Sequence, residues 1–200
     1  MIAAVIPVKR LSEAKSRLST RLSSQERAML VADLLRRTIG VLQEVEAIER
    51  IGVATEEQDL VDSFTMVDWL PDMGGLNASL AHAASWATSM NARSVLMLPG
   101  DLPLLDGSDI RALLASGMAA PNITIAPTQD GGTGAILLSP PDVIAPVFGP
   151  DSFRRHIEEA HAARISVRTV VRAGFSRELD TTEDLEYLGS HAAEFGYIPT

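Results

Sequence analysis

The stretch Leu96-Met97-Leu98-Pro99-Gly100-Asp101-Leu102-Pro103-Leu104-Leu105 decides how the rest of this sequence is interpreted. It begins within a short apolar run, 94–98, that is typical of a strand buried on both faces. The run stops at a Pro-Gly pair, and the carboxylate of Asp101 follows directly. In an open α/β sheet, ligands bind just beyond the carboxyl ends of the strands. We therefore expect Asp101 to face a ligand crevice.

Asp101 also has an ordinary alternative explanation, because aspartates often form turns or cap helices. Here, however, prolines at positions 99 and 103 stiffen both flanks, and the next helix is predicted to begin later, at Asp106-Gly107-Ser108. Functional carboxylates cluster in such crevices. We interpret Asp101 as a metal-site or phosphate-site residue.

The composition restricts the class of protein. The chain has 200 residues, which suits a single domain over 1–200 that buries about 70% of its unfolded surface. Cysteine is absent, which excludes disulfides, thiolate zinc sites and cysteine nucleophiles and agrees with a reducing compartment. No apolar run approaches the roughly 18 residues of a membrane span. We expect a cytoplasmic protein without a membrane partner.

The net charge of −9 argues against a nucleic-acid polymer as partner, because such binding depends on neutralising phosphates with Lys and Arg. A small nucleotide is still allowed, since one local basic cluster with a metal could hold it. The segment 9–17 is such a cluster and contains Lys9, Arg10, Lys15 and Arg17. It lies between the first predicted strand and the first long helix, where many nucleotide-binding folds hold phosphates. A solvated loop remains the alternative interpretation.

Apolar strands and helical segments alternate along the whole chain. The predicted strands are 3–8, 48–54, 64–69, 94–98, 122–127, 135–138 and 165–171, and the predicted helices between and after them are 24–45, 56–63, 76–90, 108–116, 152–164 and a terminal helix capped by Thr181 or Thr182. This alternation predicts a single three-layer α/β domain with a mostly parallel sheet. Ser24 is the predicted cap of the first long helix, and Arg27 in the usual Glu/Gln position leaves its capping box incomplete.

Two glycine-rich turns are candidate ligand loops. Gly74-Gly75-Leu76-Asn77 leads into a helix, where paired glycines let a flat ligand approach the backbone and the helix start offers N–H donors. The Asn77 amide can donate and accept, as a purine edge requires, although Asn is also a favoured helix cap. Gly131-Gly132-Thr133-Gly134 lacks the Lys-Ser/Thr pair of a P-loop. A β-turn is its default explanation, but its N–H and hydroxyl groups could also hold an anion.

Basic residues gather at the start of the predicted helix 152–164, which Asp151 or Ser152 would cap. Arg154, Arg155 and His156 all fall on its first turn. A helix start favours anions and not cations, so these residues indicate either an external anion or simply exposed side chains.

Two further observations concern titratable groups. Asp180, just ahead of the terminal helix, is a second carboxylate placed like Asp101. No general base is evident, because every histidine falls on a predicted helix at a surface-like position: His82, His156, His161 and His191.

Several of these stretches together resemble the 2-phospho-L-lactate guanylyltransferase family. The similar motifs, in the family's order, are Ile6-Pro7-Val8-Lys9 with Ala14-Lys15-Ser16-Arg17-Leu18, Gly74-Gly75-Leu76-Asn77, Gly100-Asp101-Leu102-Pro103, Phe148-Gly149-Pro150-Asp151-Ser152-Phe153 and Leu179-Asp180-Thr181-Thr182-Glu183-Asp184-Leu185. The resemblance covers nearly the whole chain, and the combination is specific although no single piece is. It implies a MobA-like nucleotide-diphospho-sugar transferase fold of the glycosyltransferase-A type.

The resemblance also implies a reaction. GMP would be transferred from GTP to a phosphorylated three-carbon acid, with release of pyrophosphate, in the biosynthesis of the deazaflavin coenzyme F-420. The family's acceptors are 2-phospho-L-lactate, phosphoenolpyruvate and 3-phosphoglycerate, and the sequence does not decide among them. A Mg²⁺ ion would bind Asp101 and Asp180. The other implied roles are catalytic and triphosphate contacts at Lys9, Lys15 and Arg17, with Asp101 also catalytic, guanosine contacts at Gly75 and Asn77, and acid contacts at Thr133, Gly149 and Ser152.

One position departs from the family's pattern. The family usually has Gly-Thr-Asn where this chain has Gly132-Thr133-Gly134, so an Asn side chain is missing beside the expected acid site. The missing side chain therefore bears on the identity of the acceptor more than on the type of reaction. Two other interpretations also remain: a related nucleotidyltransferase that uses CTP or a sugar phosphate, and a GTP-binding protein without activity. The sequence leaves open whether the chain forms a homodimer.

Overall fold

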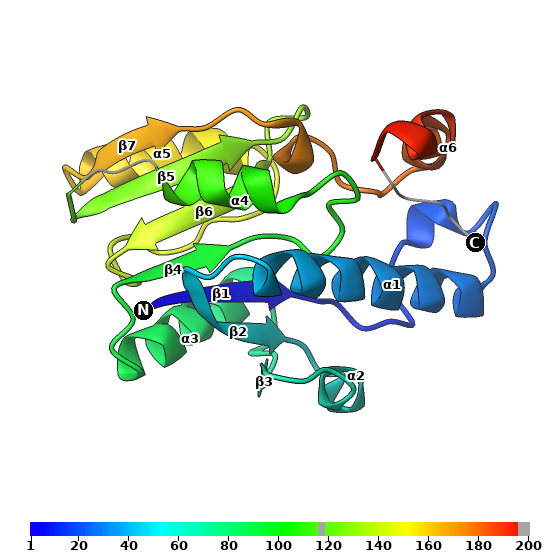
Figure 1. Ribbon diagram of the computed structural model, residues 1–200, viewed down its shortest axis with the longest axis horizontal. Helices are drawn as coiled ribbons and strands as arrows, with labels where there is room; N and C mark the ends of the chain where they lie inside the picture. The colour runs from blue at the N-terminus through cyan, green and yellow to red at the C-terminus, as the bar shows by residue number, and fades with distance from the viewer. Residues whose placement is uncertain (116–118, 196–200) are drawn as a thin grey trace.

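Seven strands form one sheet in the part of the chain that the computed structural model describes, residues 1–115 and 119–195 (Figure 1). The strand order is β3-β2-β1-β4-β6-β5-β7. Neighbouring strands are parallel except that β6 is antiparallel to both β4 and β5. The strands are β1 (Ile2–Pro7), β2 (Ile48–Ala54), β3 (Val67–Leu70), β4 (Ser94–Met97), β5 (Asn122–Pro127), β6 (Thr133–Ser139) and β7 (Ser166–Thr169). The predicted three-layer α/β class with a mostly parallel sheet is confirmed.

Helices cover both faces of the sheet. One face is covered by α1 (Ser24–Gln43), α2 (Gln58–Asp62) and α4 (Gly107–Leu114), and the other by α3 (Leu76–Ser89) and α5 (Ser152–Ala162) (Figure 1). Leu35 of α1 and Ile110 of α4 belong to one buried apolar cluster, while Leu80 of α3 and Ala160 of α5 belong to a second. The helices thus pack on both apolar faces of the sheet and form one hydrophobic core on each side of it.

Two short turns and the last helix lie toward the end of the molecule where β1, β2 and β4 finish (Figure 1). They are the turns of 3-10 helix η1 (Ser16–Leu18) and η2 (Ala173–Phe175) and the helix α6 (Thr182–Phe195). In the described part of the chain, no helix is long and apolar enough to cross a membrane.

The centre of the sheet brings the basic segment close to Asp101. β1 and β4 are parallel neighbours, with Val5 opposite Met97, so the loops that follow them leave the sheet at the same edge. β4 is buried along its whole length, as the apolar run predicted. Gly100 lets the loop after β4 lie close to β1, because a Cβ there would lie 3.0 Å from Cγ2 of Ile6.

Some predicted element ends are wrong by a few residues. The N-cap of α1 is Ser23, not Ser24, and its capping box is complete, because the Glu26 carboxylate accepts from the Ser23 N–H at 2.7 Å. β3 begins at Val67, since Phe64 still belongs to the turn that closes α2. Asp151 precedes α5 but makes no side-chain capping bond. The predicted end of the helix near Ser116 lies outside the described residues.

A bulge at the start of β6 explains the glycine that replaces the family's usual Asn. Ala126 lies opposite Ala135, whereas Pro127 lies opposite Thr133, which leaves Gly134 as the extra residue. A Cβ on Gly134 would lie 2.0 Å from the carbonyl oxygen of Phe175. The turn η2 thus lies directly against the strand, and no larger residue fits unless η2 moves.

Gly134→Asn should therefore lower the free energy of unfolding by about 1–3 kcal/mol, a usual cost of overpacking. Urea unfolding followed by circular dichroism measures this change. Gly40→Ala, in the last turn of α1, is the control: a Cβ there meets nothing within 4 Å, and we expect a gain of at most roughly 0.5–1 kcal/mol. Wild-type stability of Gly134→Asn would contradict the close packing of η2 on β6.

Candidate active site

Two carboxylates that are far apart in the sequence meet beyond the carboxyl end of β4. The backbone N–H of Leu179 donates to the carbonyl oxygen of Asp101 at 3.0 Å, which ties the segment before α6 to the loop after β4. The Leu179 side chain is fully buried in a small apolar cluster with Leu18 of η1 and Leu104. The structure thus places Asp180 beside Asp101, so the two predicted metal ligands lie together.

Lys15 lies between these two carboxylates. Its Nζ donates to Oδ2 of Asp101 and, at 2.7 Å, to Oδ1 of Asp180, and its side chain is only 6% exposed. Burial by itself lowers the pKa of the ammonium group, but the two carboxylates outweigh that effect and leave the pKa of Lys15 raised. Lys15 therefore carries a fixed positive charge at neutral pH.

The first turn of α6 holds Asp180 in place. Oδ2 of Asp184 accepts from the backbone N–H groups of Asp180 (3.0 Å) and Thr181 (2.8 Å), and Arg177 donates to Oδ1 at 2.8 Å. Oγ1 of Thr181 accepts from the Asp184 N–H at 3.3 Å, so Thr181 caps the helix, one of the two predicted caps. Asp184 and Arg177 are thus occupied in positioning the Asp180 segment.

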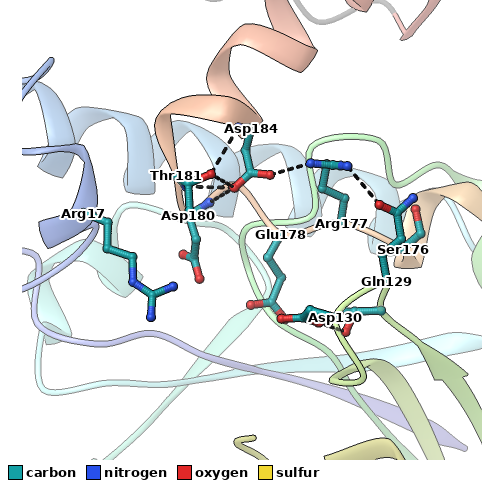
Figure 2. Close-up of a pocket in the computed structure, with 10 residues that line it drawn as sticks. Arg17, Gln129, Asp130, Ser176, Arg177, Glu178, Asp180, Thr181 and Asp184 are labelled. Atoms are coloured by element: carbon teal, nitrogen blue, oxygen red, sulfur yellow. Dashed lines mark hydrogen bonds and ion pairs between the residues drawn. The ribbon is translucent and has the colours of Figure 1, made fainter. Parts of the chain in front are cut away.

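Glu178 is a third carboxylate of the site and was missed by the sequence analysis. Burial, followed by the charges of Asp101 and Asp180, raises its pKa to about 8, although the nearby Lys15 ammonium works in the opposite direction. Figure 2 shows its carboxylate directed toward Asp130, in the turn between β5 and β6. One sequence signal could have identified Glu178. It lies two residues before Asp180 with the apolar Leu179 between them, so in an extended segment both carboxylates project to the side opposite the leucine.

A polar cavity of about 340 Å³ is lined by Asp180 and Glu178, together with Arg177 and Asp184 (Figure 2). Arg17 reaches its wall from η1 and lies on the same side as Asp180, while Gln129 and Ser176 lie on the other side. Within the described residues Arg17 forms no ion pair. The cavity therefore offers both an unpaired cation and several carboxylates to a ligand.

The donor set fits a divalent cation. Oδ1 of Asp101 is buried and has no hydrogen-bond partner, so one carboxylate oxygen of the cluster formed by Asp101, Lys15 and Asp180 is free. In residues 1–115 and 119–195, no group of three His, Cys, Asp or Glu side chains could hold a metal ion by itself. Mg²⁺ is usually held in proteins by one or two carboxylates together with waters and substrate phosphates. Asp101 and Asp180 suit an ion that completes its coordination with a nucleotide.

The three residues predicted to contact the acid lie together at the start of α5. The N–H of Ser152 donates to the carbonyl of Gly149 at 3.1 Å, and Oγ of Ser152 donates to Oγ1 of Thr133 at 2.9 Å. Gly149 has a φ of 117°, which favours glycine. Thr133 and Ser152 are buried. Their grouping agrees with a shared substrate contact, which itself stays a prediction.

His156 is buried, and the expectation of a surface position for it is wrong. Its ring Nδ1 lies 3.1 Å from Oγ1 of Thr133, and its Nε2 accepts from the backbone N–H of Val147 at 3.0 Å. Burial lowers the pKa of His156 to about 4, so the ring is neutral at pH 7. Of the other histidines, His82 is half-buried and His161 is exposed, whereas the side chain of His191 lies outside the described residues.

Asn77 connects the loop 74–77, predicted to contact guanosine, to the loop 148–152, predicted to contact the acid and called the acid loop below. Its Oδ1 accepts from the Phe148 N–H at 2.7 Å, and its Nδ2 donates to the Phe148 carbonyl at 3.1 Å. The alternative that Asn77 caps α3 is wrong, because the N-cap is Gly75. Contact between Asn77 and guanosine stays a prediction. The structure adds a positioning contact that fixes the backbone just before Gly149.

The paired glycines ahead of α3 form an open turn. Oδ1 of Asp72 accepts from the N–H groups of Gly74 (2.6 Å) and Gly75 (3.2 Å). These two donors are therefore already engaged. A Cβ on either glycine would meet nothing within 4 Å, so a ligand can approach this face of the backbone.

The remaining basic residues separate into paired and unpaired groups. Arg10 pairs with Glu56, and Arg154 pairs with Glu158 on the exposed side of α5, so neither guanidinium is free for a ligand. Lys9 is exposed at the end of β1.

Arg155 is the cation on α5 that is still available. It is half-buried and forms no ion pair with any described residue. A Cβ on Gly149 would lie 3.9 Å from its Nη1, so its guanidinium lies beside the acid loop.

Comparison with known proteins places the chain in a family. The family model described as "Guanylyl transferase CofC like" matches residues 2–195. The chain belongs to this family. A phosphoenolpyruvate guanylyltransferase of Sphaerobacter thermophilus is 34% identical, over 94% of this chain and 93% of the relative. A 2-phospho-L-lactate guanylyltransferase of Methanothermobacter thermautotrophicus is 32% identical (96% and 88%), and a 3-phospho-D-glycerate guanylyltransferase of Colwellia psychrerythraea is 27% identical (92% and 89%).

Solved structures agree on the fold. A structure from Desulfovibrio desulfuricans G20 matches with a TM-score of 0.79 and 18% identity, over 96% of this chain and 87% of that one. The 4-diphosphocytidyl-2C-methyl-D-erythritol synthase of Anaerococcus prevotii matches with a TM-score of 0.67 and 11% identity, over 96% of both chains. The predicted nucleotide-diphospho-sugar transferase fold is confirmed.

The raised pKa of Glu178 predicts a pH-dependent cost to stability. The folded state binds a proton here more tightly than the unfolded chain, so stability is lost as pH rises from about 4.5 toward 8. Glu178→Gln removes this cost, and we expect it to be more stable than wild type by at least about 1 kcal/mol at pH 8 and by much less at pH 5. Urea unfolding at both pH values, without divalent cations, measures the difference. Glu46→Gln, at an exposed position, is the control; an equal effect of both changes at pH 8 would refute the assignment.

Proposed function

We propose that this protein transfers GMP from GTP to the phosphate group of a phosphorylated three-carbon acid and releases pyrophosphate. One observation carries the proposal: two carboxylates from distant segments converge on a buried cation position at the strand ends, where Lys15 lies between Asp101 and Asp180. Family membership supports the guanylyl transfer. By family resemblance, the product would enter the biosynthesis of coenzyme F-420.

The acceptor is the open part of the reaction. The relatives' names include three different phosphorylated acids. The relative named for phosphoenolpyruvate is 34% identical, against 32% and 27% for the two named for other acids. Phosphoenolpyruvate is therefore the acceptor that we propose first.

The chemistry requires positioning and charge neutralisation rather than a general base. An oxygen of the acid's phosphate attacks the α-phosphorus of GTP, a new P–O bond forms, and the bond to the β-phosphate breaks as pyrophosphate leaves. The attacking oxygen is already anionic at neutral pH, so no proton has to be removed. This agrees with a buried histidine that is hydrogen-bonded to Thr133 and to the backbone. Catalysis of this kind comes from fixed geometry and electrostatics.

We propose Mg²⁺ as the metal, bound by Asp101 and Asp180. The support is the free, buried Oδ1 of Asp101 and the preference of Mg²⁺ for carboxylate and phosphate oxygens. When bound, the ion supplies positive charge to the phosphate oxygens at the reacting centre. Lys15 adds a fixed cation at the same place, and the unpaired Arg17 and Lys9 are the chain's further contributions to the triphosphate.

The proposed function is tested by pyrophosphate release. The protein is incubated with Mg²⁺ and GTP, and with phosphoenolpyruvate, 2-phospho-L-lactate or 3-phosphoglycerate in turn. Release with one acid supports the proposal and names the acceptor. Parallel reactions with CTP and ATP separate it from a related nucleotidyltransferase with another base. GTP binding without release from any acid would favour a binding protein instead.

Asp101→Asn should lower kcat by about 10²–10³ or more, because it removes one negative oxygen from the proposed metal site. Circular dichroism and thermal unfolding would check that the variant is folded. Asp142→Asn, at an exposed position that makes no ion pair in the described part of the chain, should keep wild-type turnover. Wild-type activity of Asp101→Asn would rule out its metal role.

Arg155→Ala should raise KM for the acid about tenfold, since a hydrogen bond to a charged group contributes about 1.5–3 kcal/mol. The matched control is Arg154→Ala on the same turn, whose guanidinium is held by Glu158. Steady-state kinetics at saturating GTP measures both variants. Equal KM values for the two would show that Arg155 does not contact the acid.

A further inference from the structure

The hydrogen bonds around His156 have a fixed direction. The backbone N–H of Val147 can only donate, and it lies 3.0 Å from Nε2 of His156. Nε2 must therefore be the unprotonated nitrogen of the ring. A neutral imidazole carries its single proton on the other nitrogen, so Nδ1 is protonated and donates to Oγ1 of Thr133 at 3.1 Å.

The surroundings of the ring support its neutral form. His156 is completely buried, and the Phe148 ring packs edge-on against it with centroids 5.0 Å apart. A hydrogen bond to the Ser152 backbone favours the protonated ring, but burial outweighs it, and the neighbouring Arg155 cation also disfavours an imidazolium, so the pKa is lowered. The tautomer with the proton on Nδ1 is thus the one that satisfies both nitrogens.

Because Nδ1 of His156 donates to Thr133, the hydroxyl proton of Thr133 has no partner among the described residues. Its Oγ1 accepts from Nδ1 of His156 and also from Oγ of Ser152, so both lone pairs are used. The hydroxyl proton of Thr133 can then only donate. Thr133 is 2% exposed, and among the described residues no acceptor for this proton is found. A buried donor without an acceptor is unfavourable, so a ligand oxygen is its natural partner.

We infer that His156 is a positioning residue that fixes the Thr133 hydroxyl as a hydrogen-bond donor toward an anionic oxygen of the acid substrate. The inference rests on the proposed function for the identity of that acid. It gives different roles to two residues that were both predicted to contact the acid: Thr133 donates to the ligand, and Ser152 donates to Thr133. With the opposite tautomer, Thr133 would present a lone pair to the anion and repel it.

The first test is made on the ligand-free protein and does not depend on activity. Long-range ¹H–¹⁵N correlation spectra of protein labelled with ¹⁵N-histidine distinguish protonated from unprotonated ring nitrogens, and the signal missing from His156→Asn assigns His156. We expect a proton on Nδ1 and none on Nε2 at pH 7. A proton on Nε2, or on both nitrogens, would overturn the inference.

The second test uses the two amide variants of His156 and measures KM for the acid and kcat separately. His156→Asn keeps an N–H group near the position of Nδ1, whereas His156→Gln places its amide near Nε2. We expect His156→Gln to raise KM for the acid about tenfold more than His156→Asn does, with a smaller effect on KM for GTP. The exposed His161→Gln, on the same helix, should match wild type. Equal KM values for the two His156 variants would refute the inference.

The outcomes distinguish this inference from the proposed function. If wild type transfers GMP to none of the acids, the proposed function fails while the NMR result still decides the tautomer. If the His156 variants do not fold, Thr133→Val and Thr133→Ser replace them, since serine keeps the hydroxyl and valine keeps the shape. A KM for the acid that is raised in Thr133→Val and near that of wild type in Thr133→Ser is expected. Equal values in the two would count against the donor role.

Discussion

The site depends on one backbone hydrogen bond, from the N–H of Leu179 to the carbonyl of Asp101. Because the Leu179 side chain is buried against Leu18 and Leu104, three segments that are distant in the sequence are held at one point. Asp180 follows Leu179 directly and is thereby placed beside Asp101, and Lys15 closes the gap between the two carboxylates. Apolar packing thus brings like charges together, and a buried ammonium group makes that arrangement tolerable.

The charges around this point explain why the site suits a cation and a polyphosphate. Asp101, Glu178 and Asp180 lie around a single lysine, so the site without ligand carries excess negative charge. That charge adds to the larger effect of burial in raising the pKa of Glu178. Oδ1 of Asp101 has no partner. In the proposed function, a divalent cation would relieve this repulsion and would also bind the triphosphate.

The acid loop is organised by neutral hydrogen bonds instead. Asn77 holds both backbone groups of Phe148, and His156 and Ser152 converge on the Thr133 hydroxyl. The bulge at Gly134 allows this: with the extra residue in β6, Thr133 lies within reach of α5 while Gly134 lies against η2. The glycine that departs from the family's pattern is therefore required by the close packing of β6 against η2. Its presence reflects this local packing rather than the identity of the acceptor.

The sequence by itself determined the order and type of nearly all elements, the buried central strand, and the family. Apolar periodicity and local motifs involve residues close together in the chain, so they can be recognised without the tertiary structure. It also placed Asp101 and Asp180 at element ends where ligands bind. It did not reveal the burial of His156, the contribution of Glu178, or the contact of Asn77 with Phe148. Each of those depends on which distant segment packs against the residue, and burial and hydrogen-bond partners follow from that packing. Only the tertiary structure could therefore decide which polar side chains are free for a ligand and which are used to hold the site in shape.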